Sequence, residues 1–212
     1  MRLTIFGATG ATGTQLVRQA LEAGHEVTAV VRDPARLTVA AHQALRVVTA
    51  EVTDPAGTAT AVRGADAVIT AIGPRGKGPT SASTDGARGI VRAMGETGSQ
   101  RLVLTSSSAL AADAGDGPFT RYVVKPAILQ PLFKDRLTDL LRAEEAVRAS
   151  ALDWTIVRPP QLTDNPAKGS YRTATDTNVK RGYRITRADL AACVLGLLDD
   201  GASIRRHISV AN

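Results

Sequence analysis

The sequence opens with the strand-like run Leu3-Thr4-Ile5-Phe6, which leads directly into Gly7-Ala8-Thr9-Gly10-Ala11-Thr12-Gly13. The glycines follow the pattern G-x-x-G-x-x-G, and a helical apolar periodicity begins immediately after them. In such a turn the first glycine permits a tight exit from the strand, the second lets the backbone approach a pyrophosphate, and the third allows close packing of helix and strand. The stretch therefore predicts a dinucleotide-binding turn, with the free N–H groups of the helix start facing the phosphates. The residues expected to contact the dinucleotide here are Gly7, Thr9, Gly10, Ala11, Thr12 and Gly13.

Short apolar runs alternate with helix-like segments through the first 110 residues. The expected strands are 3–6, 27–31, 45–49, 67–71 and 101–105, and the helices after the first are 56–63 and 83–94. This alternation is typical of βαβ units, in which a parallel sheet carries helices on both faces. The sequence therefore predicts an α/β fold with a Rossmann-like, doubly wound parallel sheet, in one domain of residues 1–212.

The second half keeps this rhythm less regularly, and we expect a small substrate-side region there. A long amphipathic helix is predicted over 127–150, interrupted near Pro131, and a strand over 154–157. Residues 161–182 are rich in turn-forming residues and suggest loops with an added hairpin. Thr186 is expected to cap a helix that ends near Leu198, before a last strand over 207–210. The apolar side of the long helix is expected to consist of Leu137, Leu140, Leu141 and Val147.

The composition argues against several classes of protein. The single cysteine, Cys193, and the three scattered histidines provide no disulfide framework and no metal-ligand spacing, so no metal is expected. The net charge of +6 comes from basic residues that never stand more than two together, which does not indicate nucleic-acid binding. No apolar stretch approaches the roughly 18 residues of a membrane span, so no membrane association is expected. A predicted strand beginning at Arg2 leaves no room for a signal peptide, and we expect a cytoplasmic protein, either a monomer or a homodimer.

The end of the second predicted strand carries information about the dinucleotide. An acidic residue there would bond the ribose hydroxyls of NAD, but Arg32 holds the position, with Arg36 about one turn later. A guanidinium group can pair with a 2′-phosphate through charge-assisted hydrogen bonds. The alternative is a pair of solvated arginines, and Asp33 keeps NAD(H) open as a cofactor. NADP(H) is the preferred prediction.

Other candidate residues follow the carboxyl ends of the predicted strands, where open α/β sheets bind ligands. Glu51 and Val52 are expected near the adenine, although a turn-capping carboxylate explains Glu51 equally well. A hydroxyl of Ser106 or Ser107 would bond the nicotinamide amide or the oxygen of a hydride acceptor, unless it caps the next turn. Gln161 would anchor the acceptor by its amide. The remaining candidates for cofactor contact are Ala71, Ile72, Gly73, Thr105 and Pro159, with Arg75 and Lys77 in the loop beyond.

Several of these segments resemble the atypical short-chain dehydrogenase/reductases with an NmrA-like NAD(P)H-binding fold, a group that includes the biliverdin IXβ and flavin reductases of animals. The resemblance rests on the glycine turn, on residues 31–37, on Leu104-Thr105-Ser106-Ser107, on residues 152–160 and on Gly169-Ser170-Tyr171. It implies a Rossmann-like domain that binds NADP(H), with the substrate over the nicotinamide. The flavin reductase has a histidine where this chain has Gln161, and a second histidine falls near Leu140. The resemblance therefore does not extend to biliverdin as substrate.

The sequence has no Tyr-x-x-x-Lys, the pair with which ordinary short-chain dehydrogenases move a proton to or from a substrate oxygen. Tyr122 and Lys125 are only three residues apart, and the following Pro126 disfavours a helix at Lys125, so loop or surface roles are favoured for both. Flavin and quinone reduction needs mainly orientation of the reactants and exclusion of water. We therefore predict an NADPH-dependent reductase of a small, flat acceptor such as a flavin or quinone. The alternatives are a non-catalytic NADP(H)-sensing regulator and a relative of the epimerases and dehydratases.

Overall fold

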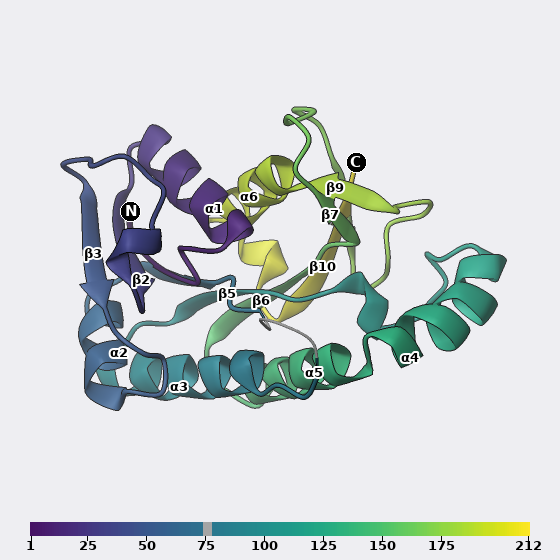
Figure 1. Cartoon of the computed structure of the whole chain (residues 1–212), viewed down its shortest axis with the longest axis horizontal. Helices are drawn as coiled ribbons and strands as arrows, with labels where there is room; N and C mark the ends of the chain where they lie inside the picture. The colour runs from purple at the N-terminus through teal and green to yellow at the C-terminus, as the bar shows by residue number, and fades with distance from the viewer. Residues whose placement is uncertain (74–77) are drawn as a thin grey trace.

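The computed structural model describes residues 1–73 and 78–212, and its centre is a twisted sheet of eight strands (Figure 1). The strand order is β3-β2-β1-β4-β5-β6-β10-β8. Every neighbouring pair is parallel except β10 and β8, which are antiparallel. The strands are β1 (Arg2–Phe6), β2 (Glu26–Val31), β3 (Leu45–Thr49), β4 (Ala67–Thr70), β5 (Arg101–Thr105), β6 (Asp153–Arg158), β8 (Arg172–Thr175) and β10 (Arg206–Ala211). The predicted α/β fold with a doubly wound, mainly parallel sheet is confirmed.

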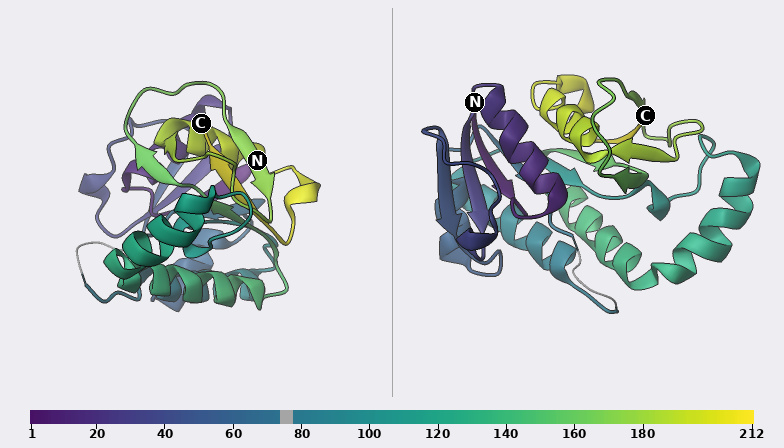
Figure 2. Two further views of the ribbon diagram at one scale, coloured as in Figure 1. Left: turned by 90° about the vertical axis from the view of Figure 1, so that its right-hand side faces the viewer. Right: turned by 45° about the horizontal axis from the view of Figure 1, so that its top comes forward.

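Helices cover both faces of the sheet, as Figures 1 and 2 show. On one face α1 (Ala11–Glu22) packs against α6 (Arg187–Gly196), and on the other α3 (Ala82–Thr97) packs against α2 (Pro55–Val62) and α5 (Lys134–Arg148). Each layer encloses its own apolar core, one built around Ile5 and Leu16 and the other around Phe6 and Ile90. Short 3₁₀ turns lie at Pro34–Arg36, Ser108–Leu110 and Gly201–Ser203.

Local sequence explains the start of α2 and of α6 and the end of α3. Asp54 accepts a hydrogen bond from the backbone N–H of Ala56 at the start of α2, and Thr186 accepts one from Asp189 at the start of α6, as predicted. Gly98 ends α3 with a left-handed φ of 79°. The seven strands predicted from the sequence agree with β1 to β6 and β10 to within one or two residues at each end. Short apolar runs between glycine and proline breaks identify the strands of a parallel sheet well.

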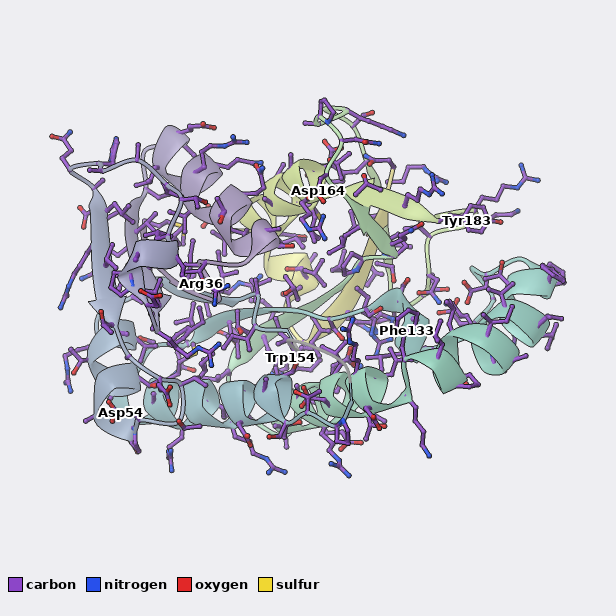
Figure 3. The ribbon with its side chains drawn as sticks, viewed as in Figure 1. Arg36, Asp54, Phe133, Trp154, Asp164 and Tyr183 are labelled. Atoms are coloured by element: carbon purple, nitrogen blue, oxygen red, sulfur yellow. The ribbon has the colours of Figure 1, made fainter. Side chains whose placement is uncertain are left out.

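The connection from β5 to α5 differs from the prediction. A π-helix spans Thr120–Leu129, a short α4 spans Gln130–Leu132, and α5 begins after Phe133 (Figure 3). The helical arm 120–132 therefore begins seven residues earlier than expected and includes Pro126. The break at Phe133 lies two residues after Pro131, near which an interruption was predicted. Lys125, in the middle of the arm, ties it to the preceding loop. Its ammonium group donates hydrogen bonds to the carbonyls of Ser108 and Ala111 and to Asp116 at 2.8, 2.6 and 2.8 Å.

The buried face of α5 is also different from the predicted apolar one. Its buried residues are Asp139, Ala143, Glu144 and Val147, whereas Leu141 is 45% exposed. Asp139 accepts hydrogen bonds from the backbone N–H groups of Ser83 and Thr84, both at 2.9 Å, and so caps the start of α3 from a neighbouring helix. Hydrophobic periodicity cannot reveal such positions, because a carboxylate is buried only where distant donors meet it.

The predicted hairpin within 161–182 is wrong. β7 (Gln161–Thr163) pairs in parallel with β9 (Arg184–Thr186), and β8 instead extends the main sheet beside β10. Asp189 holds this region together by accepting hydrogen bonds from the backbone of Lys168 and Gly169 and from the side chain of Asn212. The connections are long-range, so turn composition alone could not specify them.

Within residues 1–73 and 78–212, none of the helices combines the length and the apolar character that a membrane span requires.

Candidate cofactor site

A cleft of about 750 Å³ runs along the carboxyl ends of β1, β2, β4, β5 and β6. This is the edge at which the strand order reverses between β1 and β4, the usual ligand position in doubly wound sheets. Most of the residues predicted to contact the cofactor line it. These are Gly7, Thr9, Gly10, Ala11, Thr12, Arg32, Glu51, Val52, Ala71, Ile72, Gly73, Thr105, Ser106 and Pro159.

The glycine turn has the close contacts that its spacing suggests. Gly7 has a φ of +77°, and a Cβ there would lie 2.7 Å from the carbonyl oxygen of Ala71. A Cβ on Gly13 would lie only 2.1 Å from the carbonyl oxygen of Gly7, so Gly13 serves packing inside the turn and does not line the cleft. Both positions therefore require glycine for reasons of backbone approach.

The start of α1 fits a phosphate group. Its N-cap residue is Gly10, which has extended φ and ψ of −80° and 159°, and no side chain of the described residues caps the helix. The exposed Gly10 and Ala11 border the cleft with the positive end of the helix dipole behind them. A helix start without a side-chain cap is a ready anion site, so the residues present fit the pyrophosphate of a dinucleotide.

The two arginines after β2 are placed differently. Arg32 is exposed and lines the cleft, whereas Arg36 lies exposed in the turn Pro34–Arg36, outside the cleft lining (Figure 3). Between them, the carboxylate of Asp33 accepts a hydrogen bond from the backbone N–H of Ala35 at 3.0 Å. Asp33 therefore caps this turn and lies outside the cleft lining, so Arg32 is the charged side chain of this segment that lines the cleft.

Helix α3 packs against the loops that follow β3 and β4. Glu51 is exposed and Val52 half-buried, and a Cβ on Gly89 would lie 2.3 Å from the carbonyl oxygen of Val52, so α3 contacts this loop directly. A Cβ on Gly86 would lie 3.0 Å from Ile72 Cδ1. The predicted loop residues Arg75 and Lys77 lie outside the described part of the chain.

The three predicted catalytic residues have separate environments. The Ser106 hydroxyl lines the cleft and donates to Glu144 Oε1 at 2.7 Å. Ser107 is not in the lining, and its hydroxyl accepts from the backbone N–H of Ala109, which is the capping role left open by the sequence. Gln161 is exposed, also lies outside the lining, and accepts from Arg184 at 3.1 Å. The structure therefore brings only Ser106 of the three to the cleft.

A buried ion pair lies behind Ser106. Glu144 is 0% exposed, and its carboxylate accepts from Arg158 Nε at 2.9 Å and from Arg148 Nη2 at 3.1 Å, in addition to a second bond from Arg158 Nη2. The pair joins α5 to the end of β6 beneath the cleft. Sequence reasoning missed Glu144, and the only signal was an acidic residue at a position where a helix should be apolar.

Tyr122 and Lys125 do not form a catalytic pair. Tyr122 is 69% exposed on the outside of the helical arm, and the Lys125 side chain is buried in its bonds to Ser108, Ala111 and Asp116. Among the residues that the structure describes, no tyrosine or lysine lines the cleft.

The far end of the lining holds residues that the sequence did not single out as ligand contacts. Leu162 follows β6, Leu190 lies on α6 and Leu140 on α5, and they make this end apolar. Arg187 also lines the cleft and pairs with Asp164, which extends from the loop after β7 (Figure 3). The clue in the sequence was the position of Arg187 at a predicted helix start, whereas Leu140 lay inside the predicted helix 127–150 and gave no such signal. Asp85 and Arg136 also line the cleft.

Comparison with known proteins identifies the family. The model of the NAD(P)H-binding family matches residues 7–201, which include the glycine turn, every strand end at the cleft and α6. The chain belongs to this family. A relative is the uncharacterised protein YwnB of Bacillus subtilis, which is 25% identical over 205 residues, or 94% of this chain and 92% of YwnB.

Solved structures agree with the NAD(P)H-binding family in fold. A short-chain dehydrogenase/reductase from Veillonella parvula, crystallised in complex with NADP, superposes with a TM-score of 0.80 at 19% identity, over 100% of this chain and 94% of that one. ChuY, an anaerobillin reductase from Escherichia coli O157:H7, gives a TM-score of 0.80 at 24% identity, over 100% and 97% of the chains. The expected resemblance to oxidoreductases of the short-chain type is therefore confirmed at the level of the fold.

Proposed function

We propose that this protein is an NADP(H)-dependent oxidoreductase that passes a hydride to a flat acceptor such as a flavin or a quinone. The observation that carries the choice of cofactor is the placement of Arg32 in the cleft lining at the end of β2, whereas the neighbouring Asp33 caps a turn outside the lining. A guanidinium at this position supports binding of a 2′-phosphate. Membership of the NAD(P)H-binding family supports a nicotinamide dinucleotide in general.

Different parts of the cleft would contact different parts of the cofactor. The backbone of Gly10 and Ala11 would hold the pyrophosphate, and Glu51 and Val52 would border the adenine. Thr105 and Ser106, at the end of β5, would then border the nicotinamide. Bound NADPH supplies the hydride. The chain itself orients the two flat rings and excludes water from them with the apolar side chains of Leu140, Leu162 and Leu190.

The proposed acceptors need no acid from the protein. Carbonyl reduction in ordinary short-chain dehydrogenases uses a Tyr–Lys pair, and none lines the described cleft. A reduced flavin or quinone can take its proton from water once the hydride has been transferred. The anaerobillin reductase among the structural neighbours supports a conjugated, extended acceptor of this kind.

The test is oxidation of NADPH, followed at 340 nm, with FMN, FAD, riboflavin and menadione. We expect acceptor-dependent oxidation well above the rate without protein, and loss of it in Gly10→Asp. An aspartate suits the N-cap φ and ψ of Gly10, and its Cβ would lie 3.2 Å from the Gly7 carbonyl oxygen, so the thermal unfolding of the variant is measured alongside. Its carboxylate would occupy the N–H groups and repel the phosphates. Gly95→Asp, on the open surface of α3, is the matched control. Tight NADPH binding without turnover of any acceptor would overturn the reductase and favour a sensor.

A further inference from the structure

The Ser106 hydroxyl already donates its hydrogen to a hydrogen bond within the protein. A serine hydroxyl has one O–H donor and two acceptor lone pairs. Ser106 Oγ lies 2.7 Å from Glu144 Oε1, and a carboxylate can only accept, so the hydroxyl donates to it. What the half-buried Ser106 presents to the cleft is therefore oxygen lone pairs and not a hydrogen.

The structure also explains why this direction is fixed. An ionised carboxylate offers about four acceptor sites. In Glu144 they are filled by Ser106 Oγ and Arg158 Nε on Oε1, and by Arg158 Nη2 and Arg148 Nη2 on Oε2. The arginines are obligate donors, and the Glu144 side chain is only 1% exposed, so water has no site on the carboxylate. Glu144 cannot rotate away from Ser106 without breaking a buried ion pair.

We propose that Glu144 is a positioning residue that fixes Ser106 as a hydrogen-bond acceptor for an N–H group of the bound cofactor, namely the carboxamide of the nicotinamide. This rests on the proposed function, because it requires NADP(H) in the cleft with its nicotinamide at the end of β5. A carboxamide has N–H donors, whereas a quinone carbonyl has none. Of the two partners that the sequence left open for Ser106, the orientation of its hydroxyl favours the nicotinamide amide over an acceptor oxygen.

Binding of two cofactors that differ in one group tests the direction of this hydrogen bond, with no acceptor present. NADP⁺ has the carboxamide, and its 3-acetylpyridine analogue keeps the carbonyl oxygen but lacks the N–H. We expect the wild-type protein to bind NADP⁺ roughly three- to tenfold more tightly than the analogue, the scale of one neutral hydrogen bond, by calorimetric titration. Ser106→Ala should weaken NADP⁺ by that factor and leave the analogue unchanged.

The matched control is Ser107→Ala, which removes a neighbouring hydroxyl that caps a turn outside the cleft lining and should leave the discrimination intact. Equal affinities in the wild type, or equal weakening of both cofactors by Ser106→Ala, would overturn the proposal, because the hydroxyl would then be donating to the carbonyl oxygen or making no contact. Absence of reductase turnover would not affect this measurement, so failure of the proposed reaction and failure of the inference are distinguishable.

Glu144→Gln tests the positioning role itself. The amide nitrogen meets fewer arginine donors at the Oε1 position, where it faces Ser106 and Arg158 Nε, than at the Oε2 position, where it faces Arg158 and Arg148. In that orientation Ser106 becomes an acceptor from Gln and its proton is released toward the cleft. We expect the preference for NADP⁺ over the analogue to disappear while NADP⁺ still binds. A preference unchanged from the wild type would overturn the role of Glu144. Arg148→Gln is the matched control: Arg148 is 42% exposed, so its loss should be tolerated, and the preference should remain because Arg158 still orients Glu144. Should Glu144→Gln fail to fold, Glu144→Asp keeps the test, because its shorter side chain keeps the charge but cannot reach both Ser106 and Arg158; a full wild-type preference in that variant would overturn the role of Glu144.

Discussion

Arg32 is the single side chain on which the proposed cofactor preference depends. It lines the cleft, whereas Arg36 does not. We expect Arg32→Ala to weaken NADPH binding by about 1.5–3 kcal/mol, the scale of hydrogen bonds to a charged group, and to leave NADH nearly unchanged. Fluorescence titration with both cofactors measures the two affinities. Arg92→Ala removes an exposed arginine of α3 and should change neither. Equal weakening of NADPH and NADH would contradict the assignment of Arg32 to the 2′-phosphate.

Individual residues also show which parts of the site a local sequence pattern can predict. The glycine turn and the ends of β2, β4 and β5 could be placed at the cleft from sequence, because each follows a strand whose end is fixed by the parallel sheet. Glu144 could not, because its burial depends on Arg158, 14 residues away on another element. Ser106 and Ser107 are chemically identical neighbours, and only their distant contacts separate one at the cleft from one that caps a turn.

At the scale of elements, the close packing of α1 against the turn that precedes it can be tested by comparing substitutions at Gly13, inside this contact, and at Gly95, on an open surface. Gly13→Ala would place a Cβ 2.1 Å from the Gly7 carbonyl oxygen, and overpacking of this kind costs about 1–3 kcal/mol of stability. Gly95→Ala, exposed within α3 with open space around it, should instead stabilise the protein by roughly 0.5–1 kcal/mol. Urea unfolding of both variants measures the difference. A neutral Gly13→Ala would contradict the tight packing of the turn.

The helical arm 120–132 marks the limit of prediction for a whole element. Pro126 has no backbone N–H and disfavours a helical residue before it, so local preference argues against a helix there. The arm nevertheless forms, and the ammonium group of Lys125 in its middle donates hydrogen bonds to three oxygen atoms from residues 108–116. Strands of the sheet were predictable because their signal is local, whereas the arm depends on contacts that the sequence does not place near one another.

For the whole molecule, folding moves several pKa values in the direction that makes acid destabilising. Burial and the nearby charge of Arg158 lower the pKa of His207 below its ordinary 6.5, and this outweighs the opposing carboxylate of Asp176. Burial raises the pKa of Asp189, but hydrogen bonds from the backbone of Lys168 and from other donors more than compensate and leave it below 3.8. Both groups therefore bind protons more weakly in the folded chain than in the unfolded one.

Such groups make stability rise with pH, because the unfolded state takes up more protons as the solution becomes acidic. The free energy of unfolding should be greatest above pH 6.5 and should fall below that pH as His207 is protonated in the unfolded chain. It should fall again below pH 3.8, where carboxylates such as Asp189 are protonated in the unfolded chain. Urea unfolding between pH 8 and pH 3 measures both steps. His207→Gln should abolish the first decline, whereas His42→Gln, which removes an exposed imidazole, should preserve it. A first decline that survives in His207→Gln would assign the acid sensitivity to other groups.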